Sequence, residues 1–404
     1  MPSAVVVGAG FAGLAAGERL LAVGWDVTVF EARDRVGGRV WSERLENGAV
    51  VERGAEFVFP DHEVLRATAA RLGLSLYGKG TLYGDREPRD GPQVTRADLV
   101  DAVGRLGELH GASVEDALEG ISSDGARAAI GSRVAVSTGY ELDDQPASIL
   151  HEGAAGFGDF PSDGLAGGNQ ELAHALARAL GGRVHLEAPV ERIDWSSHGV
   201  VVRAAGAELA ADACVVATPA PHSLELVCDP PLPGWKRSTL AAVRYGDAAK
   251  LFLLLASPAE PSATLSVPGR FWTWTQRAPD GSPLPVACSF AGTRAALERL
   301  RVDEGPAEWA TAARELRPDL EYADAAPTLS TWRDDPWARG GYSARSLSSP
   351  MEDDPLQLAV GPLAFAGEHT AGAWHGLMEG ALRSGLRAAE NVLERAGAHG
   401  QPVR

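Results

Sequence analysis

The first thirty-one residues constrain the fold more than any other part of the chain. An apolar run at residues 4–7 predicts a buried strand, which leads directly into the loop Gly-Ala-Gly-Phe-Ala-Gly at residues 8–13. Residues 14–23 predict a helix, because they are rich in alanine and carry leucines for an apolar face. A second strand at residues 26–30 ends at Glu31. This order of elements is the βαβ unit that binds dinucleotides.

The chemistry of a dinucleotide explains the residue types in this unit. Glycines allow the backbone to approach a pyrophosphate, and the start of the helix supplies N–H donors and a positive dipole end. Glu31 is placed to accept hydrogen bonds from a ribose. The residues that we expect at the nucleotide are Gly8, Gly10, Phe11, Ala12, Gly13, Glu31, Ala32 and Arg33.

Two further motifs narrow the kind of dinucleotide. Glu31 begins the pattern Glu-x5-Gly-Gly-Arg, which ends at residues 37–39. Near the other end, Phe-Ala-Gly-Glu at residues 365–368 precedes Gly-Leu-Met-Glu-Gly-Ala at residues 376–381 and Ser-Gly at residues 384–385. Alone, the glycine pair also fits an ordinary turn. Together, the motifs resemble those of the flavin-containing amine oxidase superfamily, and of its bacterial flavin monoamine oxidases in particular.

The resemblance implies an α/β (α+β) fold, in which a Rossmann-like FAD-binding domain is interleaved with a substrate domain of mixed antiparallel sheet and helices. With 404 residues, the chain is long enough for two domains that share one cofactor. The implied ranges are 1–60, 164–245 and 345–395 for the FAD domain, 61–163 and 246–344 for the substrate domain, and 396–404 for a C-terminal tail.

The resemblance also implies where FAD lies. Gly341 occupies the position that carries a flavin-linked cysteine in some relatives, so FAD is expected to be bound non-covalently. Glu368 is implied to reach the ribityl or diphosphate region, and Val190 is either a valine beside the adenine or a plain core residue. The other implied contacts with FAD are Gly37, Gly38, Arg39, Val40, Gly54, Ala55, Glu56, Phe57, Trp332, Gly367, Gly376, Leu377, Met378 and Ala381.

Lys250 is the first catalytic candidate. The residues that follow it are apolar, so the strand is expected to be buried. A lysine buried with the strand needs a compensating interaction or a function. In the family that this chain resembles, a lysine on such a strand holds a water against flavin N5, where a cation stabilises the negative charge that develops on oxygen. The alternative is an edge-strand lysine that prevents aggregation.

Trp332 and Tyr342 are the second candidates. Their segment resembles the family's Trp-x-x-Asp-Pro…Gly-x-Tyr pattern, in which the tryptophan packs beside the flavin and the tyrosine forms one wall of an aromatic cage. Many relatives have an aromatic second wall where this chain has Leu377, so the cage is half missing. Trp374 or an aromatic residue of the middle domain is a candidate replacement. The alternative is that these aromatic residues are plain core, which is what we expect of Trp337.

Three more residues bear on the substrate. L-amino-acid oxidases have a carboxylate-binding arginine about where Phe57 stands, which favours a simple amine over an α-amino acid here. Glu56 is either a polar group at the site or a surface-loop glutamate. His375 is either a proton carrier or a residue that packs against the helix start. We therefore expect a substrate site formed by Phe57, Tyr342, Trp374, His375 and Leu377.

Composition excludes several classes of function. A formal net charge of −17 argues against a nucleic-acid partner. The three cysteines have no metal-ligand spacing, which predicts neither a disulfide framework nor a metal site. The chain shows no signal peptide or transmembrane run, so we expect a cytoplasmic protein with no membrane partner. A homodimer is compatible with the sequence. Lysine is scarce, which makes Lys79, Lys236 and Lys250 worth inspecting.

Local patterns predict the remaining elements. Residues 62–74, 95–109 and 113–118 predict helices, whereas the Gly-, Pro- and charge-rich residues 78–92 predict a surface loop. The strands predicted for the substrate domain lie at residues 249–255, 271–275 and 286–290.

The implied reaction is the oxidation of an amine. A hydride passes from the amine's α-carbon to flavin N5, O2 reoxidises the flavin to give H2O2, and the imine hydrolyses to an aldehyde or ketone. One alternative is a desaturase or natural-product tailoring oxidase of the same superfamily, which Leu377 favours. Another is a non-enzymatic binding protein similar to GDP-dissociation inhibitors, against which both flavin motifs argue.

Overall fold

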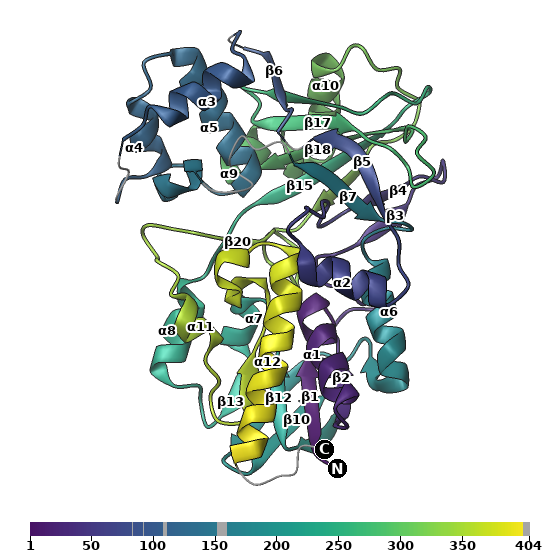
Figure 1. Cartoon of the computed structure of the whole chain (residues 1–404), viewed down its shortest axis with the longest axis vertical. Helices are drawn as coiled ribbons and strands as arrows, with labels where there is room; N and C mark the ends of the chain where they lie inside the picture. The colour runs from purple at the N-terminus through teal and green to yellow at the C-terminus, as the bar shows by residue number, and fades with distance from the viewer. Residues whose placement is uncertain (83, 92, 108–110, 152–159, 399–404) are drawn as a thin grey trace.

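A computed structural model describes residues 1–82, 84–91, 93–107, 111–151 and 160–398. Figure 1 shows two stacked regions, with the N-terminal strand and helix in the lower one and a broad sheet in the upper one. The helices are α1 (Phe11–Ala22), α2 (Glu63–Arg71), α3 (Arg96–Gly104), α4 (Val114–Glu119), α5 (Asp124–Thr138), α6 (Glu171–Leu180), α7 (Ala220–Glu225), α8 (Gly234–Ala242), α9 (Arg294–Arg299), α10 (Ala307–Leu316), α11 (Asp353–Gln357) and α12 (Met378–Ala398).

The lower region contains a parallel sheet that is buried on both faces. Alternate residues of the first strand enter different cores: Val6 packs with residues of α1 and α12, whereas Val5 and Val7 pack on the opposite side. α12 lies alongside α1, which places the C-terminal motif next to the N-terminal loop (Figure 1). The strands, in spatial order, are β21 (Leu363–Phe365), β12 (Ala213–Val216), β1 (Ser3–Val7), β2 (Asp26–Phe30) and β8 (Val184–His185).

The upper region contains a six-stranded mixed sheet between two sets of helices. Leu251 and Leu253 pack with residues of α10, and Phe252 packs on the other face with residues of α5. Lys250 lies two residues before Phe252 on β15, so both side chains point to the same face of the sheet. The strands, in spatial order, are β19 (Thr328–Thr331), β15 (Ala248–Leu254), β18 (Val286–Gly292), β17 (Phe271–Thr275), β16 (Ser262–Ser266) and β6 (Glu87–Asp90).

Smaller sheets accompany these two large ones. A four-stranded sheet has the order β11 (Ala207–Ala211), β10 (Gly199–Ala204), β9 (Val190–Ser196) and β13 (Val227–Asp229). The two-stranded sheets pair β3 (Ser42–Arg44) with β4 (Val50–Glu52), β5 (Leu76–Leu82) with β7 (Pro161–Leu165), and β14 (Arg244–Tyr245) with β20 (Ser343–Ala344). The division into domains with the boundaries given above stays a prediction.

The structure differs from the local predictions in three places. The surface loop expected at residues 78–92 is wrong, because β5 and β6 occupy much of it and pair with β7 and β16. α5 was not predicted. Its buried residues lie on most sides of the helix, and the 3.6-residue period that marks an amphipathic helix is therefore weak. The expected helix at residues 95–109 ends at Gly104 in α3, and part of that range lies outside the described residues.

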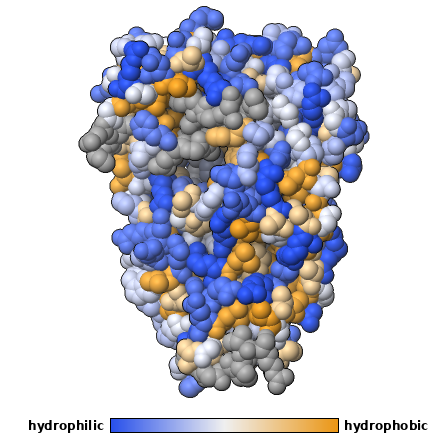
Figure 2. All heavy atoms as spheres, in the orientation of Figure 1, coloured by the Kyte–Doolittle hydropathy of each residue, from blue (hydrophilic) through white to orange (hydrophobic). Residues whose placement is uncertain are grey.

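None of the helices in the described ranges combines the length with the hydropathy that a transmembrane segment requires. Figure 2 shows hydrophilic and hydrophobic residues interspersed on one face of the molecule.

Candidate active site

A cavity of about 1030 Å³ joins the two regions and collects the predicted site residues. Every residue predicted above for the cofactor, the substrate or catalysis lines it, except Gly13. Gly13 has a packing role instead, because a Cβ there would stand 1.9 Å from the carbonyl oxygen of Gly8. Residues from both ends of the chain thus surround a single space.

The glycine-rich loop has the shape that a dinucleotide needs. Gly8 has φ +102°, a conformation that favours glycine. A Cβ at Gly10 would meet no atom within 4 Å and would instead project into open space. The start of α1, with its unpaired N–H groups, follows at Phe11. These residues fit the pyrophosphate of a flavin dinucleotide.

Glu31 is held at the cavity wall by the backbone. Its Oε2 accepts the Ala9 N–H at 2.7 Å, and its Oε1 accepts the Arg33 N–H at 2.9 Å. The Arg33 guanidinium in turn forms two hydrogen bonds with Asp335, at 2.8 and 2.5 Å. The nucleotide loop is therefore attached to the segment that carries Trp332 and Tyr342.

Glu368 connects the two flavin motifs directly. Its Oε1 accepts hydrogen bonds from Arg39 Nη1 at 2.8 Å and the Ser343 N–H at 3.1 Å. Its Oε2 accepts the Ser343 hydroxyl at 2.5 Å and the Gly376 N–H at 2.7 Å. Burial opposes the charge, but Arg39 and these donors outweigh it and lower the pKa of Glu368 to about 2. Glu368 is thus an anion at neutral pH that holds three segments together.

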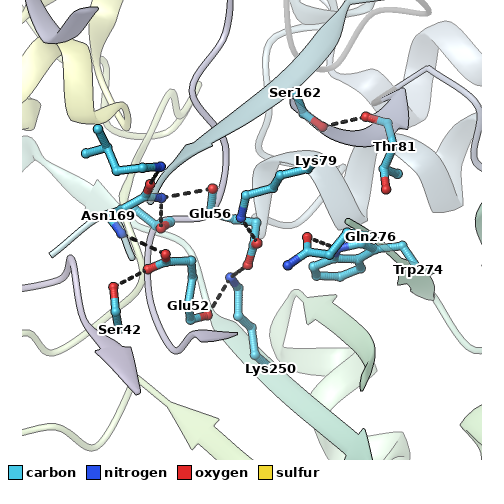
Figure 3. Close-up of polar contacts among 12 residues, drawn as sticks. Ser42, Glu52, Glu56, Lys79, Thr81, Ser162, Asn169, Lys250, Trp274 and Gln276 are labelled. Atoms are coloured by element: carbon cyan, nitrogen blue, oxygen red, sulfur yellow. Dashed lines mark hydrogen bonds and ion pairs between the residues drawn. The ribbon is translucent and has the colours of Figure 1, made fainter. Parts of the chain in front are cut away.

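Lys250 lies in a buried cluster of charges (Figure 3). Its Nζ donates to Glu56 Oε2 at 2.5 Å and to the Glu52 carbonyl oxygen at 2.8 Å. β15 lies between β19 and β18, so the edge-strand alternative for Lys250 is wrong. Glu56 is 8% exposed, so the surface-loop alternative for this glutamate is also wrong. The second carboxylate oxygen of Glu56 accepts a hydrogen bond from Lys79 Nζ. Lys79 lies in the range for which a surface loop was predicted.

Aromatic side chains form much of the cavity beyond this cluster. Trp332 Nε1 donates to the Arg53 carbonyl oxygen at 3.0 Å, and the Tyr342 hydroxyl donates to the Ser137 carbonyl oxygen at 2.9 Å. These bonds fix both rings at the cavity wall. Leu377 lines the same cavity without an aromatic ring.

The sequence left open which aromatic residues of the middle domain join this wall. Trp272 and Trp274 stack with ring centroids 4.2 Å apart, and Phe57 lies 5.8 Å from Trp274. β17 was predicted as a strand, and Trp272 and Trp274 lie two residues apart, so their side chains share one face of it. The local sequence does not show whether that face meets a cavity. Phe59 and Phe290 also line the space.

Most of the chain matches a family of known proteins. A sequence model described as "Flavin containing amine oxidoreductase" matches residues 11–110 and 139–393. The chain belongs to the flavin-containing amine oxidoreductase family. This confirms the predicted family and the prediction of a flavin-dependent amine oxidase enzyme, and it argues against the non-enzymatic alternative.

The relatives of this amine oxidoreductase agree with that assignment. The Mycobacterium tuberculosis protein "Putative flavin-containing monoamine oxidase AofH" is 29% identical, with 96% of each chain covered. Amine oxidase [flavin-containing] B of Cavia porcellus is 26% identical over 97% of this chain and 86% of its own length.

Solved structures confirm the predicted fold class. Putrescine oxidase bound to putrescine superposes with a TM-score of 0.84 at 22% identity, covering 97% of this chain and 99% of that structure. Cyclohexylamine oxidase from Brevibacterium oxydans IH-35A gives a TM-score of 0.80 at 21% identity, with 98% and 99% covered.

Three remaining cavity residues of this amine oxidoreductase have defined surroundings. His375 Nδ1 lies 3.2 Å from the Ser343 carbonyl oxygen, and burial lowers the pKa of His375. The Trp374 ring lies under the Arg383 guanidinium, 4.7 Å from its centroid. Trp337 is 38% exposed and lines the cavity beside His222, so its assignment to the core is wrong.

Proposed function

We propose that this chain is an FAD-dependent oxidase that converts an amine to an imine and passes the electrons to O2, giving H2O2. The observation that carries the proposal is the cavity itself, in which Lys250, Trp332 and Tyr342 share one space with the glycine loop and Glu31. When bound there, FAD would accept a hydride from the α-carbon of the amine and be reoxidised by O2. The imine would then hydrolyse to an aldehyde or ketone.

The residues proposed to hold FAD come from three segments. The loop from Gly8 to Ala12 and the Glu31 carboxylate serve the nucleotide half. The backbone of the 37–39 segment and the start of α12 serve the diphosphate and flavin halves, because a helix N-terminus favours negative charge. Gly341 offers no side chain for a covalent bond, which supports non-covalent binding.

The residues proposed to handle the substrate act by orientation and charge. Trp332 and Tyr342 are fixed by hydrogen bonds to backbone carbonyls, and rigid aromatic walls restrict the pose of the amine. An amine that enters deprotonated needs no strong base. Lys250 keeps a buried positive charge at the cavity, where it would stabilise charge that develops on oxygen.

The proposed substrate is a simple amine. Phe57 lines the cavity, and its ring packs against Trp272 and Trp274. By the family resemblance, it stands about where L-amino-acid oxidases carry a carboxylate-binding arginine. Curated relatives include L-amino-acid oxidases as well as monoamine oxidases, so the choice rests on this residue. Leu377 in the cavity wall supports a second candidate, a tailoring oxidase or desaturase that acts on a larger scaffold.

An absorbance spectrum followed by anaerobic titration tests the proposal. Primary, secondary and cyclic amines, with L-amino acids as the comparison, are added to the purified holoenzyme. We expect a flavin spectrum that one class of amine bleaches and that recovers with formation of H2O2 when air is admitted. A yellow protein that no amine bleaches would favour the tailoring oxidase, and a covalently attached flavin in acid-precipitated protein would contradict non-covalent binding.

A further inference from the structure

All three lysines of this chain are buried. Their exposed fractions are 1% for Lys79, 0% for Lys236 and 5% for Lys250. Lysine is among the residues that proteins bury least, so each position requires a compensating interaction. Lys236 Nζ donates to the carbonyl oxygens of Pro355 and Leu356 at 2.8 and 3.0 Å. Lys79 has no part in the function proposed above, yet it is as deeply buried as the other two.

Lys79 and Lys250 share one carboxylate. Figure 3 shows their stems approaching Glu56 from opposite sides. Lys79 Nζ donates to Glu56 Oε1, and Lys250 Nζ donates to Oε2 at 2.5 Å. Burial opposes the charge of Glu56, but the two ammonium groups outweigh it and hold the pKa of Glu56 below its usual range.

The cluster therefore keeps an excess of positive charge. The two ammonium groups and the Glu56 carboxylate together carry one net positive charge, which the partly ionised Glu52 reduces but does not cancel. Glu52 is the second carboxyl group of the cluster and accepts hydrogen bonds from Ser42 Oγ at 2.7 Å and the Asn169 N–H at 2.8 Å. Burial raises the pKa of Glu52 to about 7, so this group is partly neutral near physiological pH. Without Lys79, Glu56 would neutralise Lys250.

The fold makes room for the stem of Lys79. Lys79 lies on β5, and Gly164 lies on the paired strand β7, where its register partner is Tyr77. A Cβ at Gly164 would stand 2.5 Å from Lys79 Cε. A side chain at this position would push the ammonium group away from Glu56. The pairing of Lys79 with Glu56 thus depends on a second residue that is 85 positions away in sequence.

We infer that Lys79 is a positioning residue for the oxidative half of the proposed reaction: by occupying one oxygen of Glu56, it keeps Lys250 an effective cation at the cavity wall, where it would act on bound flavin. In that half-reaction O2 takes up two electrons from the reduced flavin and two protons, and becomes H2O2. Negative charge reaches oxygen before the protons do, so a net positive cluster lowers the barrier. The inference rests on the proposed function in one respect: the protein must bind a flavin.

Variants that change the net charge of the cluster test this role of Lys79. Lys79→Met leaves the cluster with one ammonium and one carboxylate, whereas Glu56→Gln combined with Lys79→Met restores one net positive charge. We measure the midpoint potential of the bound flavin and the rate constant with which O2 reoxidises dithionite-reduced flavin. For Lys79→Met we expect a more negative potential and a rate constant about tenfold lower. For the double variant we expect both values to return toward those of the wild type.

Two controls separate charge from packing. Lys236→Met removes another buried lysine, which does not line the cavity, and should leave the potential and the reoxidation rate unchanged. Gly164→Ala retains every charge but displaces Lys79, and should shift both values in the direction of Lys79→Met. It also provides a test if Lys79→Met does not fold.

Thermal unfolding of the flavin-free protein should show non-additive effects of Glu56→Gln and Lys79→Met, because the two residues are in contact.

The outcomes distinguish this inference from the proposed function. An unchanged potential and rate in Lys79→Met, or a double variant no closer to the wild type than the single variant, would overturn the role of Lys79. Because dithionite replaces the amine, both readouts can be taken even if no amine reduces the flavin. That result would contradict the amine oxidase proposal and leave the role of Lys79 intact.

Discussion

Arg39 Nη1 and Glu368 Oε1 lie 2.8 Å apart, although 329 residues separate them in the chain. Arg39 ends the Gly-Gly-Arg motif and Glu368 ends the strand motif near the C-terminus, so this ion pair joins the two flavin signatures. Arg39 Nη1 also donates to the Gly341 carbonyl oxygen at 3.0 Å. The proposed cofactor site therefore depends on a contact that forms only when both ends of the chain have folded together.

Replacing Arg39 should release the flavin. Arg39→Met leaves Glu368 buried with only the Ser343 and Gly376 donors, and removing one partner of a buried ion pair costs about 3 kcal/mol. We expect purified Arg39→Met to contain less flavin and to bind added FAD at least tenfold more weakly. The ratio of flavin to protein absorbance and a reconstitution titration measure this. Arg19→Met breaks an exposed pair with Glu390 and serves as the control. Wild-type flavin content in Arg39→Met would contradict the prediction.

Lys250 should affect reoxidation more than reduction. Lys250→Met removes the ammonium group that faces the cavity, and the loss of a charge that stabilises an anionic stage costs about a hundredfold in rate. Stopped-flow mixing of the dithionite-reduced holoenzyme with O2 measures this step directly, and anaerobic mixing with an amine measures reduction separately. Reoxidation at the wild-type rate would show that Lys250 has another role.

The sequence predicts best those parts of the site that local chemistry specifies. The loop from Gly8 to Gly13 needs its glycines for a turn and a close approach, and it can be recognised without knowledge of distant residues. Likewise, Thr95 is an N-cap residue type with Asp98 three residues later, and its hydroxyl accepts the Asp98 N–H at 3.2 Å at the start of α3. Such features follow from a few neighbouring residues.

Lys79 illustrates what the sequence does not show. Its neighbours are rich in glycine and charge, which is the composition of a turn, and nothing nearby explains a buried ammonium group. Its environment comes from Glu56 on another segment and from the space left by Gly164 on β7. Similarly, the alternation along β17 places Trp272 and Trp274 on one face, but only the packing of the sheet turns that face toward the cavity.

Tyr342 should act through its ring. Tyr342→Leu removes an aromatic wall, whereas Tyr342→Phe removes only the hydroxyl that donates to Ser137. Because the ring orients the neutral amine and lost orientation raises the barrier, we expect kcat/KM for the best amine to fall about tenfold in the leucine variant. The phenylalanine variant should retain most of the activity. Equal losses in both variants would assign the effect to the hydroxyl and contradict the cage.

Glu52 should make stability depend on pH. Burial raises the pKa of Glu52 to about 7 from its usual 4.5, so the folded protein keeps this proton where the unfolded chain has released it. The folded state binds more protons in that window, and the contribution of Glu52 to stability therefore falls as pH rises from about 4.5 to about 7.

Glu52→Gln removes this titration, and its free energy of unfolding relative to the wild type should rise by about 2 kcal/mol between pH 5 and pH 7. The reason is that only the wild type loses the proton that its folded state prefers to hold, while the amide stays neutral throughout. Urea unfolding of both proteins at several pH values measures the difference. Glu119→Gln, an exposed position at the end of α4, should show no such slope. A difference between Glu52→Gln and the wild type that stays constant with pH would mean that Glu52 is already ionised in the folded protein at pH 5.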